Sequence, residues 1–333
     1  MKILINNEID SIQWQQLVDE SPNASFFQTK ACYDFYCSLR FLKPFLLGVE
    51  DDNELVALVC GYVIADGNIL KQFFSRRAIV PGGPIFSSNC SENGLDLLLS
   101  ALKKELKSKA IYIELRNYTD YNNNRLHFEK SGFNYQPHLN FHVKTNSVED
   151  ALKNLSTGKR RDVKLTLKEG VIIVDTKEKD DIDAYFKLLS ELYQTRIKTP
   201  FFPFEFFQKI VALPQSHLFA IKRNNELIGG SLCVALEGKV LFEWFVCGLD
   251  GKFKNVYPST LATWAAIEYA AAKGFMYFDM MGAGKPDEGY GVRDFKAKFG
   301  GELVEHGRFL YICNPAMYKF GKKMIELIKK RKK

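Results

Sequence analysis

The chain contains the same strand–turn–strand pattern twice, and the two copies lie about 170 residues apart. Residues 46–56 read LLGVEDDNELV, and residues 218–228 read LFAIKRNNELI. The positions identical in both copies are Leu46, Asn53, Glu54 and Leu55, matched by Leu218, Asn225, Glu226 and Leu227. In each copy two apolar runs flank a polar turn that contains asparagine, a pattern typical of a β-hairpin.

The two copies stay in step beyond the hairpin. Residues 111–114 (IYIE) resemble residues 276–279 (MYFD), and further matches follow each of them. A repeat of this length is too long for a solenoid, so the chain is predicted to contain a duplicated domain. Apolar patterns follow the order β-β-β-α-β-α-β in each half, which predicts an α/β fold with a mixed sheet and helices on both faces.

The repeat also predicts the domain organisation. The first domain is expected to span residues 1–145 and the second residues 146–312, followed by a segment of different character, residues 313–333. At 333 residues and 46% hydrophobic content, the chain is long enough for each half to bury its own core.

Several classes of protein are disfavoured by the composition. The opening MKILINNEID carries acids where a signal peptide needs an apolar region, and the sequence has no apolar run of membrane-spanning length. The seven cysteines are scattered, with no C-x-x-C pair and no histidine at metal-ligand spacing. We therefore expect a cytoplasmic protein with reduced thiols, no metal site, and a monomeric state.

The C-terminal segment holds the positive charge of the chain. Residues 315–333 contain eight basic residues and one acid, so they carry the entire formal net charge of +7. Apolar residues recur there at helical spacing, at Met317, Phe320, Met324, Leu327 and Ile328. One interpretation is a basic amphipathic helix that contacts an anionic membrane or a nucleic acid. The other is a helix docked on the first domain with a solvated basic tail.

Four motifs in the second half carry a resemblance to a known family. They are LSTGKRRDVK at 155–164 followed by KEGV at 168–171, YPS at 257–259 before a Trp-bearing helix, FD at 278–279 followed by a glycine, and GV at 291–292 leading to FKAKFG at 295–300. Their order and spacing resemble the Fem-type aminoacyltransferases. These enzymes consist of two tandem domains of the GNAT N-acyltransferase fold, and the resemblance covers nearly the whole chain.

The resemblance implies a function. Enzymes of this family transfer an amino acid from aminoacyl-tRNA to an amino group on the peptide of a nucleotide- or lipid-linked peptidoglycan precursor. Aminoacyl-tRNA and that precursor are thus the expected partners, with no cofactor. Two alternatives remain: a CoA-dependent acyltransferase that acts on a sugar or polysaccharide precursor, and a non-catalytic protein that has kept only the fold.

The loop before the Trp-bearing helix disfavours CoA. CoA-dependent GNAT enzymes bind the diphosphate on backbone amides of a glycine-rich loop at a helix N-terminus. The equivalent residues 252–260 read KFKNVYPST, which contains no glycine, and Pro258 has no N–H to donate.

Lys296 and Asp279 are the candidate catalytic residues. The resemblance places Lys296 at a functional lysine near the reacting ester, where an ammonium would stabilise negative charge. Asp279 ends an apolar strand, a location where a carboxylate can orient an amine or accept its proton. For both residues the alternative is structural: a solvated helix face for Lys296 and an ion pair for Asp279.

Five further residues are candidates for binding substrate. Arg196 resembles a family position that contacts the precursor, and an Arg fork suits a diphosphate. Phe295, Lys298 and Tyr257 lie in the motifs of the resemblance, and Arg76 is a candidate in the first half. The family often has a further basic contact in its first helix, where this chain has Tyr36.

Overall fold

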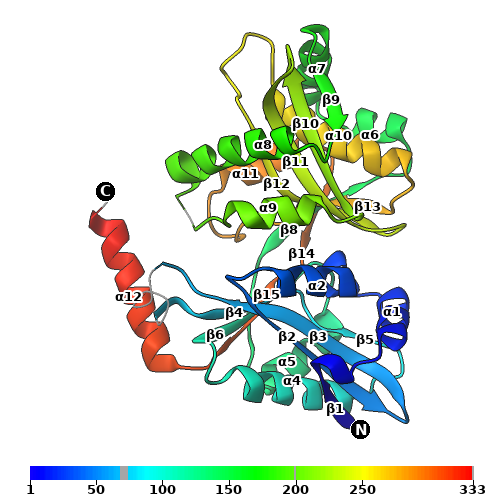
Figure 1. The fold of residues 1–333 in the computed structure, drawn as a ribbon, viewed down its shortest axis with the longest axis vertical. Coiled ribbons are helices and arrows are strands. Elements are labelled where there is room, and N and C mark those ends of the chain that lie inside the picture. Colours follow the sequence, from blue (N-terminus) through cyan, green and yellow to red (C-terminus); the bar gives the residue numbers. More distant parts are fainter. Residues whose placement is uncertain (68–73, 199, 332–333) are drawn as a thin grey trace. The chain divides into compact units, whose positions relative to one another are not determined.

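The computed structural model describes residues 1–67, 74–198 and 200–331. They form two compact units, each with its own mixed sheet (Figure 1). Unit 1 consists of Met1–Pro137 together with His306–Lys333, and unit 2 consists of His138–Glu305. The predicted α/β architecture with two tandem domains is therefore confirmed.

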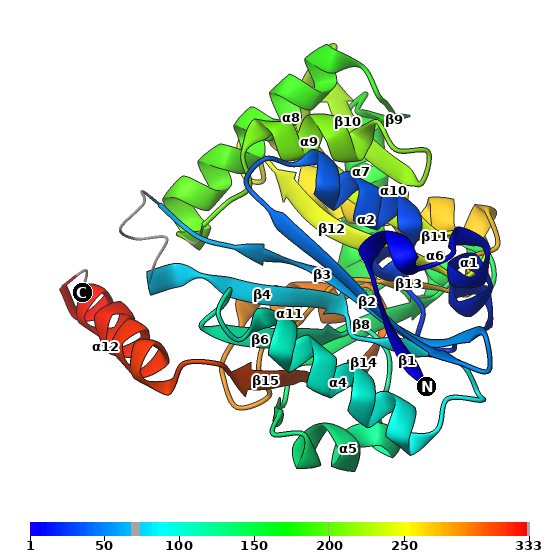
Figure 2. The same cartoon turned by 60° about the horizontal axis from the view of Figure 1, so that its bottom comes forward.

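The described strands of unit 1 form a sheet in the order β1-β2-β3-β4-β6-β15-β7, with β5 paired to β3. The strands are β1 (Lys2–Ile5), β2 (Lys43–Asp51), β3 (Glu54–Ile64), β4 (Arg77–Gly82), β5 (Ile85–Phe86), β6 (Tyr112–Asn117), β7 (Asn134–Gln136) and β15 (Arg308–Ile312). The helices are η1 (Asn6–Glu8), α1 (Ser11–Glu20), η2 (Phe26–Gln28), α2 (Lys30–Ser38), α4 (Glu92–Leu106), η3 (Asn122–Asn124), α5 (Arg125–Lys130) and α12 (Pro315–Arg331). Helices α1 and α2 cover one face of this sheet, and α4 covers the other (Figures 1 and 2).

The described strands of unit 2 have the order β14-β8-β13-β12-β11-β10-β9. The strands are β8 (Leu139–Lys144), β9 (Ile172–Asp175), β10 (Ser216–Arg223), β11 (Glu226–Leu236), β12 (Val240–Gly248), β13 (Tyr277–Asp279) and β14 (Glu302–Glu305). The helices are α6 (Val148–Asn154), α7 (Thr157–Lys168), α8 (Lys179–Leu192), the π-helical segment η4 (Tyr193–Ile197), α9 (Phe204–Val211), α10 (Pro258–Ala272) and α11 (Gly291–Ala297).

The two units exchange one strand each. β8 follows unit 1 in the sequence but pairs with β13 and β14 of unit 2, while β15 follows unit 2 and pairs with β6 and β7 of unit 1. The compact units consequently differ from the expected ranges 1–145 and 146–312, because residues 138–145 and 306–312 change places. The exchanged segments are equivalent in the repeat, so each fills the same position in the other sheet.

Helices cover both faces of the unit 2 sheet. Two neighbouring glycines of β11 show how closely these helices approach the strand. A Cβ on Gly229 would lie 2.9 Å from Pro258 of α10, and a Cβ on Gly230 would lie 3.0 Å from Tyr185 of α8. Successive residues of a strand point to opposite faces, so α10 and α8 lie on opposite sides of β11. The core against α10 contains residues such as Leu241, Leu261 and Phe278, all fully buried.

The two sheets differ at their parallel strand pair. In unit 1, β4 and β6 are in register along all of Arg77–Gly82. In unit 2, β12 and β13 are in register only over Val240–Phe242 and Tyr277–Asp279, and β12 then continues to Gly248 in register with β11. The two parallel strands of unit 2 therefore separate beyond Phe242 and Asp279. The charged residues Glu243 and Asp279 both lie at this point of the sheet.

Candidate active site

Lys296 is buried at the point where β12 and β13 separate. Its side chain is 7% exposed, and its Nζ donates hydrogen bonds to the carbonyl oxygens of Met280 and, at 2.7 Å, Gly282. Burial lowers the pKa of Lys296, and the carboxylates of Glu243 and Asp279 raise it in part. Two carbonyls use both N–H groups of a neutral amine, so only the charged ammonium has a third N–H to offer to a ligand.

Asp279 is fully buried at the end of β13. Its Oδ1 accepts hydrogen bonds from Asn140 Nδ2 at 2.8 Å and from the Met281 N–H at 2.6 Å, and His142 Nε2 lies 3.0 Å from Oδ2. Asn140 and His142 both belong to β8, the strand that unit 2 receives from the first repeat. Three donor groups thus fix this carboxylate, and two of them come from the exchanged strand.

The turn after Asp279 is held from both sides. The Met281 N–H donates to Asp279, and the Gly282 N–H donates to Asn140 Oδ1 at 2.8 Å. The carbonyl oxygens of Met280 and Gly282 accept from Lys296. Met281 adopts a left-handed conformation with φ of 51°, which costs energy for a residue with a side chain. Backbone of this kind persists where the surroundings impose it, as it does at many functional sites.

Glu243 is a buried carboxylate that the sequence analysis did not select. It is 3% exposed, and its Oε1 accepts from Ser231 Oγ at 3.1 Å and from Thr263 Oγ1 at 2.8 Å. Within the described part of the chain, its Oε2 is buried without a hydrogen-bond partner. Burial raises the pKa of Glu243, and the charge of Lys296 lowers it in part. A single acid in the apolar strand 240–246 was the available sequence signal.

A β-bulge directly after Glu243 changes the direction of the residues that follow it. The register of β11 and β12 shifts between Leu232 and Cys233, which leaves Trp244 as the extra residue of β12. Residues two apart in a regular strand share a face, but the bulge reverses this rule. Glu243 shares the face of Leu241 and bonds to α10, whereas the bulge turns Phe245 to the opposite face, where its ring lies 5.3 Å from that of Phe207 on α9.

Two of the sequence motifs meet in the structure. Lys159, from LSTGKRRDVK, lies 3.9 Å from the ring centre of Phe295 and 5.0 Å from that of Phe299, both from FKAKFG. The Ser156 N–H also donates to the Lys298 carbonyl at 2.9 Å. Gly300 ends the second motif with φ of 79°, and a Cβ there would lie 2.3 Å from the Asn154 carbonyl oxygen. The motifs therefore hold α11, and with it Lys296, against the α6–α7 junction.

Lys159 is a second buried lysine that the sequence analysis did not select as a site residue. It is 7% exposed and donates a hydrogen bond of 2.6 Å to Thr260 Oγ1. Burial lowers its pKa to about 8, a change that Lys298 reinforces and Asp162 and Asp250 oppose. Its place within a recognised motif was the signal that could have identified it.

The remaining predicted residues have different surroundings. Phe295 of α11 is half-buried under Lys159, and Lys298 is exposed directly after the end of this helix. Tyr257 directly precedes α10, and its N–H donates to Thr166 Oγ1 at 2.9 Å. Arg196 is exposed near the end of η4. Arg76 belongs to unit 1, where it is half-buried directly before β4, while Tyr36 is fully buried in the same unit.

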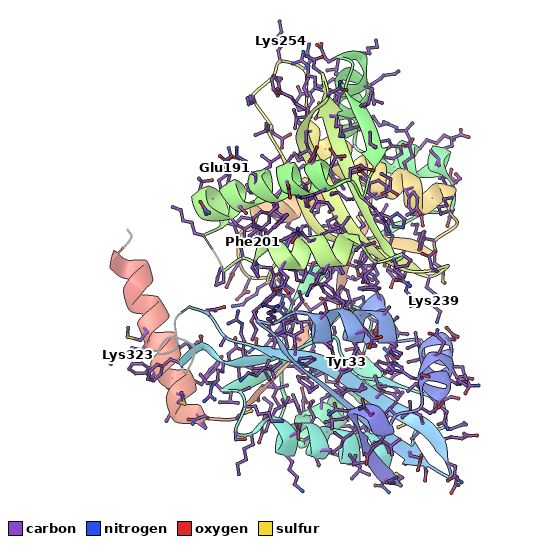
Figure 3. The ribbon with its side chains drawn as sticks, viewed as in Figure 1. Tyr33, Glu191, Phe201, Lys239, Lys254 and Lys323 are labelled. Atoms are coloured by element: carbon purple, nitrogen blue, oxygen red, sulfur yellow. The ribbon has the colours of Figure 1, made fainter. Side chains whose placement is uncertain are left out.

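An aromatic surface adjoins the bulge. Tyr193 of η4 packs on Phe201 with ring centres 4.3 Å apart, and Phe201 and Phe202 each lie within 6.3 Å of Phe245. Phe201 is labelled in Figure 3, in the segment between α8 and α9. Burial raises the pKa of Tyr193 to about 12, and Tyr290 adds to this shift. These contacts connect the segment that carries Arg196 to the β12 bulge.

The N-terminus of α10 is already occupied by a carboxylate of the chain. Asp250 accepts a hydrogen bond of 3.3 Å from the Ser259 N–H and a second one from the Ser259 hydroxyl. The strand lies equally close to the helix, because a Cβ on Gly248 would be 2.4 Å from the Ser259 nitrogen. With Pro258 at the first helical position, the amides that bind a diphosphate in CoA-dependent enzymes are here absent or bonded to side chains.

Glu114, the counterpart of Asp279 in unit 1, has a different environment. Arg116 donates to its Oε2 at 2.9 Å and Arg308, from the exchanged strand β15, donates to its Oε1 at 2.7 Å. Burial alone would raise the pKa of Glu114, but the two arginines outweigh it and lower the pKa to about 2. Glu114 therefore forms an ion pair that joins β6 to β15, beside the intact pairing of β4 and β6.

Replacing Glu114 with glutamine is expected to destabilise the protein in a pH-dependent way. Its lowered pKa stabilises the fold above pH 4.5, the usual value, and this contribution is lost as the pH falls to about 2. At pH 7 the loss should be on the order of 3 kcal/mol, measured by urea unfolding. Glu129→Gln, which removes an exposed pair with Arg125, is the control. A loss that is the same at pH 7 and pH 2.5 would contradict this account.

Comparison with known proteins supports the fold. Residues 153–296 match the family model of the acetyltransferase (GNAT) domain. Sequence comparison with curated proteins gives no match. Within the described residues, no group of three or more His, Cys, Asp or Glu side chains is arranged to hold a metal ion.

Solved structures match along almost the whole chain. The crystal structure of FemX superposes with a TM-score of 0.73 at 15% identity, over 96% of this chain and 99% of that one. The C-terminal domain of a putative lysylphosphatidylglycerol synthetase from Agrobacterium fabrum gives 0.59 at 12% identity, over 96% and 95%. A tandem GNAT protein from the clavulanic acid biosynthesis pathway gives 0.57 at 12% identity, over 94% and 99%. The tandem GNAT fold, of the type seen in FemX, is confirmed.

Proposed function

We propose that the protein transfers an aminoacyl group from aminoacyl-tRNA to an amino group on the peptide of a nucleotide- or lipid-linked peptidoglycan precursor. The observation that carries this proposal is the buried Nζ of Lys296, which is bonded to Met280 and Gly282 and, when protonated, has one further N–H. Two solved structures of the same fold, FemX and the lysylphosphatidylglycerol synthetase domain, support aminoacyl transfer.

The reaction needs little more than orientation and charge stabilisation. The neutral amine of the acceptor attacks the ester carbon, a C–N bond forms, and negative charge develops on the former carbonyl oxygen. The C–O bond to the ribose then breaks, the nitrogen loses a proton, and the ribose oxygen gains one. The third N–H of Lys296 would stabilise the developing charge, and the carboxylates of Glu243 and Asp279 would keep the lysine protonated.

The surroundings of the α10 N-terminus support a donor whose diphosphate, if it has one, is not bound at this helix. The Asp250 carboxylate holds the Ser259 N–H and hydroxyl, and its charge would repel the diphosphate of CoA. CoA-dependent transfer to a sugar or polysaccharide precursor is the alternative, favoured by the match of residues 153–296 to an acetyltransferase domain.

All seven cysteines are free, in keeping with the proposed cytoplasmic location.

Donor binding tests the proposal directly. The wild-type protein is expected to retain aminoacyl-tRNA on a filter and to show no heat of binding with acetyl-CoA in calorimetry. Asp250→Ala is the matched variant, since it frees the Ser259 donors and removes the repelling charge; it should bind acetyl-CoA better than the wild type. Turnover of acetyl-CoA by the wild type would overturn the donor assignment, and binding of neither donor would favour a non-catalytic protein.

A further inference from the structure

Helix α12 of unit 1 has exposed apolar side chains. Phe320 is 50% exposed and Met324 is 42% exposed, and they lie one helical turn apart on the same face. The ring of Phe74, from the segment before β4, lies 5.4 Å from that of Phe320 and is itself 47% exposed. We call Phe74, Phe320 and Met324 the apolar patch of α12.

Lysines border this patch. Lys319 and Lys323 directly precede Phe320 and Met324 in the helix, and both are exposed, as is Lys322. Lys323 is labelled on α12 in Figure 3, and Figure 2 shows this helix at the periphery of unit 1. Beyond them the sequence adds five more basic residues at 329–333 and a single acid, Glu326. Leu327 and Ile328 continue the apolar spacing, but their side chains lie outside those described.

The helix is attached to unit 1 at its start. Tyr318 packs edge-on against Tyr112 of β6, with ring centres 5.6 Å apart, and the Met317 N–H donates to Asn314 Oδ1 at 3.0 Å. These contacts fix the first turn and leave the patch one turn further along the helix. Within the described residues no helix has the length and hydropathy to span a bilayer, so a lipid contact of α12 would be peripheral.

We propose that the apolar patch and lysines of α12 dock unit 1 reversibly on an anionic membrane surface. Phe74, Phe320 and Met324 would enter the boundary between headgroups and acyl chains, where exposed apolar area is removed from water. Lys319 and Lys323 would then lie among lipid phosphates. A tRNA backbone would use the lysines equally well, but it offers no apolar phase for Met324 and Phe320. The patch therefore favours lipid.

Vesicle sedimentation of the full chain tests this inference without any assay of turnover, so its outcome is independent of the proposed reaction. The wild type is expected to sediment with phosphatidylglycerol-containing vesicles, to remain in solution with pure phosphatidylcholine, and to dissociate as salt is raised. The double variant Lys319→Glu/Lys323→Glu should partition roughly 25-fold more weakly or worse. The control Lys104→Glu/Lys107→Glu makes the same charge change at exposed positions of unit 1.

A second variant separates lipid from nucleic acid. Phe320→Ser/Met324→Ser keeps every charge, so it should lose vesicle binding while retaining any affinity for tRNA measured on filters. Both α12 variants should melt as the wild type does, because the altered side chains are exposed. Wild-type vesicle binding by the serine variant, or vesicle binding equally weakened by the Lys104/Lys107 control, would overturn the inference. Loss of tRNA binding alone in the Lys319/Lys323 variant would assign the helix to the donor.

Discussion

Replacing Lys296 with methionine should lower kcat by roughly 100-fold or more, the usual effect of removing one group that stabilises an oxyanion. The methylene stem is retained and only the ammonium is lost, so the third N–H can no longer reach the reacting oxygen. The KM for the donor should change less than kcat, because the interaction is made chiefly in the transition state. Steady-state kinetics with aminoacyl-tRNA would measure both constants.

The fold of the Lys296→Met variant is expected to persist. Two carbonyls lose a donor, which costs stability, but a charge no longer has to be buried, and these effects oppose one another. Lys273→Met, at an exposed position after α10, is the control for loss of a lysine. Unchanged turnover together with wild-type melting would show that Lys296 only fastens the turn after β13.

Replacing Glu243 with glutamine should change the pH dependence of the reaction. Glu243 raises the pKa of Lys296, so its removal lets burial lower that pKa further. Only the protonated lysine has a spare N–H, so activity falls when Lys296 loses its proton. As the pH is raised, the variant should lose activity earlier than the wild type does. The alkaline limb of kcat against pH therefore moves toward lower pH.

The stability of the Glu243→Gln variant should change less than its activity. Glutamine can still accept from Ser231 and Thr263, and it replaces a carboxylate whose Oε2 has no partner among the described residues. The free energy of unfolding should change little, because relief of a buried carboxylate oxygen without a partner and loss of the attraction to Lys296 oppose one another. Glu268→Gln, on a half-buried residue of α10, is the matched control. An alkaline limb that stays in place would show that Glu243 does not act on Lys296.

The duplication has produced two halves with different strand separation. In unit 1 the parallel pair β4–β6 stays together, and Glu114 is locked by two arginines. In unit 2 the pair β12–β13 separates after three residues, and Asp279 is held by neutral and imidazole donors beside a buried lysine. The same fold thus supports an ionic lock in one unit and a candidate reaction site in the other.

The sequence determined the repeat, the α/β class and the order of elements, because these depend on local periodicity and on turn residues such as Asn53 and Asn225. Lys296 became a candidate through the resemblance to the Fem-type aminoacyltransferases, and Asp279 through its position at the end of an apolar strand. The apolar spacing of Phe320 and Met324 was equally visible, and their exposure in α12 is the feature that makes a membrane contact testable.

Only the tertiary structure decided which strands belong to which sheet, and this changed the composition of the site. Asn140 and His142 reach Asp279 because β8 crosses into unit 2, a pairing between residues 137 and 139 positions apart that no local pattern encodes. Glu243 acts electrostatically on Lys296, which belongs to α11, and this proximity between two distant elements is not encoded by the two-residue periodicity of β12. Burial then set the direction of the pKa shifts of Glu243 and Lys296. Desolvation depends on every neighbour in space, so chemistry at this site follows from packing and not from residue type alone.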